Sequence, residues 1–249
     1  MMIRFIIIIL FSSLCWASIE ENLFYEGNNH MIAENYNDAV QVYETILNLG
    51  YKSSELYYNL GNAYYRLNFI GQSIWAYTNA IQLAPRNQDI KHNLSVANAR
   101  IIDRIKIPET FIILDYYRLF KSSLTINEWF LMGSLSLFLV SLIFFGNKFG
   151  IIKGKIFRTI RQILIYTLLI IHIIALDSYL ENYNNKIAVV LSNDVEAYSG
   201  PFYGENSILF KVNEGSVVDV SSMQKDWVEI ILIDGNKGWI QKKSIRTLN

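Results

Sequence analysis

Long apolar stretches occur at three places along the chain, and polar residues flank each of them. The first follows Arg4 and ends in Cys15-Trp16-Ala17, which places small residues where a signal peptidase cuts. Residues 1–17 are therefore predicted to be a secretory signal peptide that is cleaved after Ala17. An uncleaved membrane anchor is the alternative.

The other two apolar stretches, residues 124–146 and 160–180, predict a hairpin of two transmembrane helices. Residues 129–145 carry no charge, which corresponds to about 25 Å of α-helix at about 1.5 Å per residue. Two such stretches behind a signal peptide are typical of a membrane protein. His172 lies within the second stretch, where we expect a neutral imidazole bonded to the partner helix; a functional role is the alternative.

The segment between these two stretches predicts the orientation of the hairpin. Residues 147–159 contain Lys148, Lys153, Lys155 and Arg158 and no acidic residue. By the positive-inside rule this basic loop is cytoplasmic, and both flanking regions lie outside the cytoplasm.

Residues 18–106 contain a helical repeat with a period of 34 residues. Small and aromatic residues recur at that interval: Gly27 and Gly61, Ala39 and Ser73, Tyr43 and Tyr77. The second copy has the spacing of a tetratricopeptide repeat at Tyr57, Leu60, Gly61, Tyr64, Ser73, Tyr77, Ala80 and Pro85. The small residues are expected where two antiparallel helices approach closely, so the region is predicted to be all-α.

Two further segments follow the repeats. Residues 89–106 show a helical apolar stripe and predict a capping helix, because a short solenoid needs its last apolar face covered. Residues 107–123 are interrupted by Pro108 and predict an amphipathic linker that leads to the first apolar span.

The first helix of each repeat is expected to line a concave surface that binds a protein partner. Asn62 would hydrogen-bond a ligand backbone, and Arg66 would meet a carboxylate. The alternative is that the aromatic residues pack against the capping helix. The predicted protein-binding residues are Phe24, Asn28, Met31, Tyr58, Asn62, Tyr65 and Arg66.

Residues 187–249 alternate between apolar and polar positions and predict a small all-β barrel. Turn signals separate the expected strands, and Asp234-Gly235 is a strong hairpin signal. The strands are expected at residues 187–191, 195–198, 208–212, 217–220, 227–233 and 238–240.

This segment resembles the bacterial SH3-like domain. The motifs that carry the resemblance are Ser199-Gly200-Pro201, Glu214-Gly215, Asp226-Trp227 and Gly238-Trp239-Ile240. The resemblance implies a binding module for cell-wall peptides or proteins, with an aromatic groove made by Tyr198, Phe202, Tyr203 and Trp227. The alternative is that Trp227 and Trp239 are barrel core, which is the expectation for Trp239.

Charge and cysteine content exclude several functions. The 22 Lys and Arg residues balance 22 Asp and Glu residues, so the chain has no surplus cations for nucleic acid. A single cysteine excludes an intramolecular disulfide and a cysteine-rich metal site. The sequence shows no nucleophile elbow and no histidine pair for zinc. We therefore expect no catalytic residues, no cofactor and no metal, and hence a protein that is not an enzyme.

The order of the parts resembles the BatE proteins of the bacterial Bat (aerotolerance) group. The segments Leu56 to Tyr65 and Asp89 to Leu94 are similar to that family's repeat region. The resemblance implies a scaffold in the bacterial inner membrane, with both terminal domains periplasmic and with Bat membrane proteins that carry von Willebrand factor A domains as partners. A peptidoglycan-binding envelope sensor is the alternative function.

Overall fold

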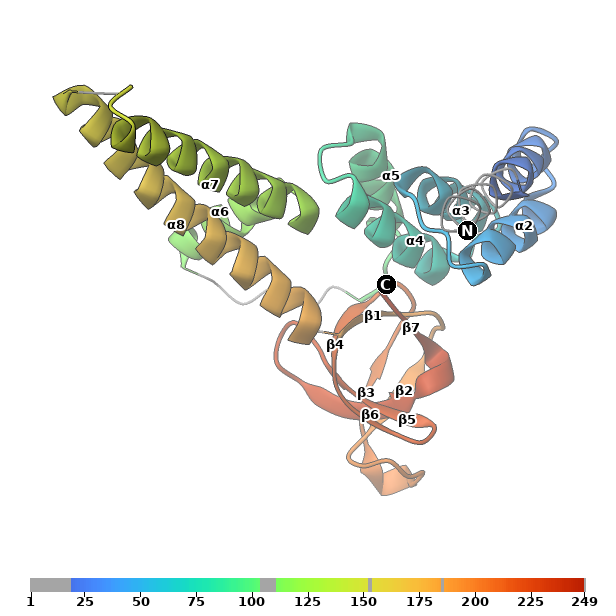
Figure 1. Ribbon diagram of the computed structural model, residues 1–249. Coiled ribbons are helices and arrows are strands. Elements are labelled where there is room, and N and C mark those ends of the chain that lie inside the picture. The colour runs from blue at the N-terminus through green and yellow to red at the C-terminus, as the bar shows by residue number, and fades with distance from the viewer. Residues whose placement is uncertain (1–18, 104–110, 152–153, 185, 249) are drawn as a thin grey trace, which may run out of the picture. The chain divides into compact units, whose positions relative to one another are not determined.

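The computed structural model describes residues 19–103, 111–151, 154–184 and 186–248. The chain divides into two compact units, Met1–Pro108 with Ile187–Asn249, and Glu109–Lys186. The predicted signal peptide, residues 1–17, lies outside the described residues. Within the first unit, residues 19–103 form a helical module and residues 186–248 form a sheet module (Figure 1).

The helical module consists of consecutive antiparallel helices. A helix over residues 19–32 is followed by α2 (Tyr36–Asn48), α3 (Ser54–Arg66), α4 (Ile70–Leu83) and α5 (Gln88–Asn98). Side chains begin two of these helices, since Ser53 accepts a hydrogen bond from the Leu56 amide and Asn87 accepts from Asp89 and Ile90. Each polar cap satisfies backbone donors that the first helical turn leaves unpaired.

The contacts between these helices repeat at the 34-residue interval seen in the sequence. A Cβ atom on Gly27 would lie 2.4 Å from the Tyr43 ring, and one on Gly61 would lie 2.6 Å from the Tyr77 ring. Both tyrosines are buried, so only glycine lets the helices approach this closely. The structure thus shows two similar helix pairs; their assignment as tetratricopeptide repeats rests on the sequence spacing and stays a prediction.

The predicted capping helix over residues 89–106 is too long, because α5 ends at Asn98. Beyond it, Ile101 packs against the helical core and Asp103 accepts hydrogen bonds from Asn213 and Ser216 of the sheet module. A continued helix would carry these side chains away from those contacts. Residues 104–110 lie outside the described part of the chain.

The sheet module is a seven-stranded sheet with the strand order β3-β2-β6-β5-β4-β1-β7. The strand pairs whose register is resolved are antiparallel. The strands are β1 (Lys186–Val190), β2 (Val195–Tyr198), β3 (Ile208–Val212), β4 (Val217–Gln224), β5 (Trp227–Ile231), β6 (Lys237–Gln241) and β7 (Ile245–Thr247). The first six agree with the strands expected from alternation, whereas β7 was not predicted.

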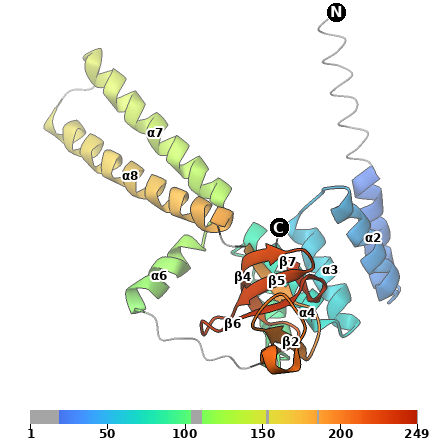
Figure 2. The same ribbon diagram turned by 90° about the horizontal axis from the view of Figure 1, so that it is seen from below.

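The second unit contains α6 (Ile112–Lys121), α7 (Ile126–Lys148) and α8 (Lys155–Asn184). A capping box begins α7, in which Thr125 and Glu128 each accept a hydrogen bond from the other's backbone amide. Figure 2 shows α7 and α8 side by side. The loop between the two helices is shorter than the expected 147–159, because α7 ends at Lys148 and α8 begins at Lys155.

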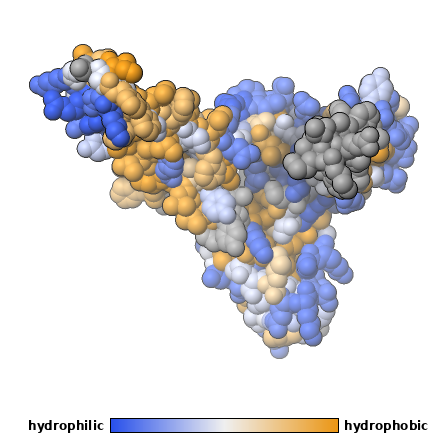
Figure 3. All heavy atoms as spheres, viewed as in Figure 1, coloured by the Kyte–Doolittle hydropathy of each residue, from blue (hydrophilic) through white to orange (hydrophobic). Residues whose placement is uncertain are grey.

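Both α7 and α8 are long and apolar enough to cross a membrane. Only 17% of each apolar window is buried, which differs from the buried core helix of a water-soluble protein. Apolar residues accordingly cover much of the face of the helix pair seen in Figure 3. At the contact between the helices, the His172 ring lies against Gly133 of α7. The prediction that His172 bonds to the partner helix is wrong, because its Nδ1 lies 2.8 Å from the Leu168 carbonyl oxygen of its own helix.

Candidate binding site

A pocket of ≈ 300 Å³ opens on the helical module. Four of the seven predicted protein-binding residues line it, and three residues that were not predicted complete it. The lining residues are Met31, Asn62, Tyr65, Arg66, Tyr77, Asn93 and Val96. These side chains come from the first helix of each pair, from α4 and from α5, so the pocket combines apolar walls with polar groups suited to a peptide.

Asn62 belongs to a hydrogen-bond network that fixes the floor of this pocket. Its Oδ1 accepts from the Tyr77 hydroxyl at 2.6 Å and from Asn93 Nδ2 at 2.9 Å. The same arrangement occurs one repeat earlier, where Asn28 Oδ1 accepts from Tyr43 at 2.7 Å and from Asn59 at 2.9 Å. Both predicted ligand-binding asparagines therefore stabilise the helix pairs.

Burial raises the pKa of Tyr43 and Tyr77 to about 12, so both hydroxyls remain protonated donors at neutral pH. Asn62 keeps its amide nitrogen for a ligand, since no described residue accepts a hydrogen bond from it. The side chain can thus hold the pocket and still present a donor.

Arg66 provides the positive charge at the rim of the pocket. Its guanidinium lies 4.7 Å from the centre of the Tyr36 ring and 3.9 Å from Glu34 Oε1. The side chain is 55% exposed, so both contacts are weak and the cation can reach an acidic ligand.

The other predicted residues of this surface pack inside the module. Phe24 lies against Tyr43, and Tyr58 lies against Tyr77, each with ring centres 6.0 Å apart. Phe24, Asn28 and Tyr58 are not among the residues that line the pocket. Phe24 and Asn28 contact other helices than the capping helix named in the alternative. Tyr58 does contact it, since its hydroxyl accepts a hydrogen bond from Asn93 of α5.

On the sheet module, three of the four predicted groove residues form one aromatic surface (Tyr198, Tyr203 and Trp227). The Tyr203 and Trp227 ring centres are 4.9 Å apart, and Tyr198 lies 5.5 Å from Trp227 and 5.7 Å from Tyr203. Trp227 and Tyr198 are nearly buried, whereas Tyr203 is 68% exposed. The surface therefore has a fixed floor and one exposed ring that a ligand can stack against.

Two neighbours shape this aromatic surface. The Tyr198 hydroxyl donates a 2.6 Å hydrogen bond to Glu196 Oε2, which raises the pKa of Tyr198 to about 12. Phe202, the fourth predicted residue, is 55% exposed, and a Cβ atom on Gly200 would lie only 2.4 Å from its ring. Gly200 is therefore needed for this conformation of the loop.

The expectation that Trp239 belongs to the barrel core is wrong. Trp239 is half-buried, while its neighbours Gly238 and Ile240 occupy the buried positions of β6. In the antiparallel register Trp239 is opposite Tyr198, so both side chains share the outer face of the sheet. Side chains alternate between the two faces of a strand, so the buried positions of Gly238 and Ile240 put Trp239 on the outer face. This alternation was the sequence signal that could have predicted its position.

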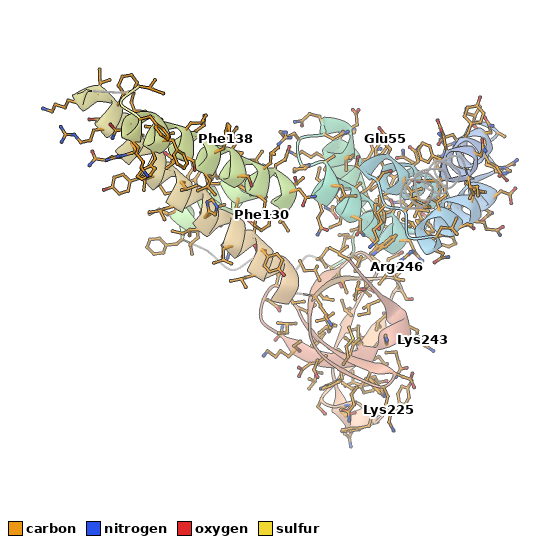
Figure 4. All side chains as sticks on the ribbon, in the orientation of Figure 1. Glu55, Phe130, Phe138, Lys225, Lys243 and Arg246 are labelled. Atoms are coloured by element: carbon orange, nitrogen blue, oxygen red, sulfur yellow. The ribbon has the colours of Figure 1, made fainter. Side chains whose placement is uncertain are left out.

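The helical and sheet modules are joined by Arg246, which sequence reasoning did not single out. Its two terminal nitrogens donate to Glu44 of α2 at 2.7 and 2.8 Å, and its guanidinium lies 3.4 Å from the centre of the Trp75 ring. Burial alone would lower the pKa of Arg246, but Glu44 holds that pKa above its usual range. Figure 4 shows Arg246 where the two modules meet.

Further contacts surround this ion pair. The buried Trp75 donates from Nε1 to the Thr247 carbonyl oxygen at 2.8 Å, and the Tyr64 hydroxyl donates to Glu44 at 2.7 Å. Gly71 donates to Glu214 at 3.1 Å. Val189 of the sheet module belongs to the core of the helical module. The sheet thus contacts α2 and α4, and none of the residues that line the pocket takes part in these contacts.

Residues 192–247 match the family described as the bacterial SH3 domain. The sheet module is SH3-like. The seven-stranded antiparallel arrangement is consistent with this match, and the matched residues include the whole aromatic surface and Arg246. A bacterial SH3 domain indicates a protein- or peptidoglycan-binding role. The comparison with curated proteins gave no match.

Among the described residues, no group of three or more His, Cys, Asp or Glu side chains could hold a metal ion.

Proposed function

We propose that the protein is a non-enzymatic scaffold of the bacterial envelope, anchored in the inner membrane by α7 and α8. The tetratricopeptide-like helices bind a protein partner, and the SH3-like domain binds a second protein. Two observations support this proposal: the match of the sheet module to the bacterial SH3 domain, and the polar pocket of the helical module. The resemblance to BatE proteins favours a Bat-type stress complex with von Willebrand factor A partners.

The contact between the two modules supports the proposed topology. One module precedes the two apolar helices in the chain and the other follows them, yet Glu44 and Arg246 are in direct contact. A hydrocarbon layer about 30 Å thick would separate them if the chain crossed the membrane once. Two crossings return the chain to the same side, and the cations of the connecting segment favour the periplasm as that side.

Because the modules are joined, their two binding surfaces have a fixed geometry. A scaffold with this property presents two partners to each other, or one partner at two places, without the entropy cost of ordering a flexible linker. The alternative function is a peptidoglycan sensor, which the aromatic surface also suits because an exposed ring can stack on a sugar or peptide face.

Reporter fusions test the topology. Alkaline phosphatase fused after Ser122 or after Asn249 is expected to be active, whereas a fusion after Gly150 is expected to be inactive. A green fluorescent protein fusion at the same sites should give the opposite pattern, which controls for expression. Activity at Gly150 together with inactivity at the other two sites would contradict the periplasmic assignment.

Photocrosslinking in intact cells tests the scaffold function. A photoreactive residue at Tyr65, on the pocket rim, should yield a discrete protein adduct, and Arg66→Ala should reduce that adduct several-fold because the ligand loses its cationic contact. Mass spectrometry identifies the adduct; a protein with a von Willebrand factor A domain is the expected partner. Thermal unfolding of Arg66→Ala should be unchanged, since the side chain is exposed.

The matched control places the photoreactive group at Glu55, an exposed residue of α3 that does not line the pocket (Figure 4). Equal adducts from both positions would contradict a specific surface. A probe at Tyr203 separates the two functions: muropeptide adducts without protein adducts, and pelleting of the full chain with purified sacculi, would favour the sensor.

A further inference from the structure

Helix α6 carries an apolar stripe that is largely exposed in the described part of the chain. The stripe consists of Ile112, Ile113, Tyr116, Leu119 and Phe120, whose side chains are 57–69% exposed. These positions follow the spacing i, i+1, i+4, i+7 and i+8, so they share one face of the helix. A contiguous exposed apolar face of this kind indicates a partner surface.

An adjacent side of α6 is fixed to the ends of the two long apolar helices. The Tyr117 hydroxyl donates to Asp177 at 2.7 Å, and Lys121 Nζ contacts Asp177 at 2.6 Å and Glu181 at 2.5 Å. Burial would lower the pKa of Lys121, but the two carboxylates accept its hydrogen bonds and raise that pKa. Lys121 thereby offsets one of the two negative charges at this end of α8.

Helix α7 contacts α6 as well. Trp129 donates from Nε1 to the Lys121 carbonyl oxygen at 3.0 Å, and its ring lies 5.5 Å from the Phe120 ring. Tryptophan is enriched at the boundary between hydrocarbon and water. The first turn of α7, the last turns of α8 and the end of α6 therefore lie at one level of this unit.

We infer that α6 lies along the outer surface of the bilayer, with the Ile112–Phe120 stripe inserted among the lipid headgroups and upper acyl chains. This inference rests on the proposed membrane crossing of α7 and α8. The occupant is lipid because the stripe meets that helix pair at the Phe120–Trp129 contact, and only 17% of each apolar window of the pair is buried. An interfacial helix of this type inserts its apolar face by about 5–10 Å.

The interfacial position also suits the ion pairs of α6. The Lys121–Asp177–Glu181 cluster holds charges at the boundary, where they retain access to water.

Site-specific fluorescence quenching tests the inference on the full chain in vesicles of phosphatidylethanolamine and phosphatidylglycerol. In a Cys15→Ser background, an NBD fluorophore is attached to the single cysteine of Leu119→Cys or of Arg118→Cys. The probe at 119 should be quenched several-fold more by lipids with a nitroxide near the headgroup, and several-fold less by aqueous iodide, than the probe at 118. Arg118 is the matched control because it is the neighbouring, polar position of the same helix and is 61% exposed.

A third probe at Phe138→Cys tests the membrane crossing separately from the position of α6, since Phe138 lies in the middle of α7 and is 59% exposed (Figure 4). If a nitroxide deep in the bilayer quenched the probe at 138 while iodide quenched the probe at 119, the interfacial position of α6 would be overturned. The membrane crossing of α7 and α8 would then still stand. Iodide quenching at 138 would overturn the membrane crossing on which it rests. Protection at 119 from both quenchers would mean that protein covers the stripe, and would also overturn the inference.

Discussion

Arg246→Ala is expected to destabilise the joined modules by about 2–3 kcal/mol. The substitution leaves the Glu44 carboxylate partly buried with only the Tyr64 hydroxyl as a donor, and it removes the cation from the Trp75 ring. The upper range for a fully buried pair does not apply, because the Arg246 and Glu44 side chains are 30% and 22% exposed. For a folded unit of this size the melting temperature should fall by roughly 5–10 °C.

Thermal unfolding of the full chain in detergent, followed by tryptophan fluorescence, measures this effect. Lys243→Ala is the matched control, since Lys243 is an exposed cation close to Arg246 in the chain. Arg246→Lys should recover only part of the loss, because an ammonium group cannot make two parallel bonds to a carboxylate. The double variant Glu44→Ala/Arg246→Ala should lose less than the sum of the two single variants. If Arg246→Ala and Lys243→Ala melted at the same temperature, the ion pair would not join the modules.

Gly61→Val is expected to cost about 3 kcal/mol through overpacking between α3 and α4. The first added carbon would lie 2.6 Å from the Tyr77 ring, which is 2% exposed and held by its 2.6 Å hydrogen bond to Asn62. On an open helical surface the same substitution would be close to neutral, because glycine is itself a poor helix former. The sign of the effect therefore reports the close approach of the two helices.

Urea denaturation of the full chain in detergent gives the change in the free energy of unfolding. Gly27→Val should behave in the same way, because Gly27 meets Tyr43 as Gly61 meets Tyr77. Gln82→Val, on an exposed position of α4, is the control for valine in a helix. The double variant Gly61→Val/Tyr77→Leu should be more stable than Gly61→Val. A neutral effect of Gly61→Val would contradict the helix contact.

The elements could be predicted from the sequence wherever a local pattern determines them. The spacing of Gly61 and Tyr77 indicates a close helix pair, and the alternation around Asp234-Gly235 indicates a hairpin. The strand β7 has only three residues, Ile245–Thr247, which is too short for a periodic signal. It forms because β1 and the helical module pair with it and pack against it.

The candidate site was predicted less completely, because its polar groups have internal partners. Asn62 was predicted on the concave binding surface and lines the pocket, yet its oxygen bonds to Tyr77 and Asn93, which a linear pattern does not show. The contact between the modules could not be predicted, since Glu44 and Arg246 are separated by 202 positions. No sequence period connects residues at that distance.

The position of β7 also constrains how the chain is made. During synthesis the faces of α2 and α4 that receive Arg246 are complete long before β7 leaves the ribosome, because both apolar helices are translated in between. Throughout that interval Trp75 and Glu44 lack the residues that later cover them, and uncovered apolar surface promotes aggregation of nascent chains. On the proposed periplasmic topology, we therefore expect export of this protein to depend on a periplasmic holding chaperone more strongly than its size alone would suggest.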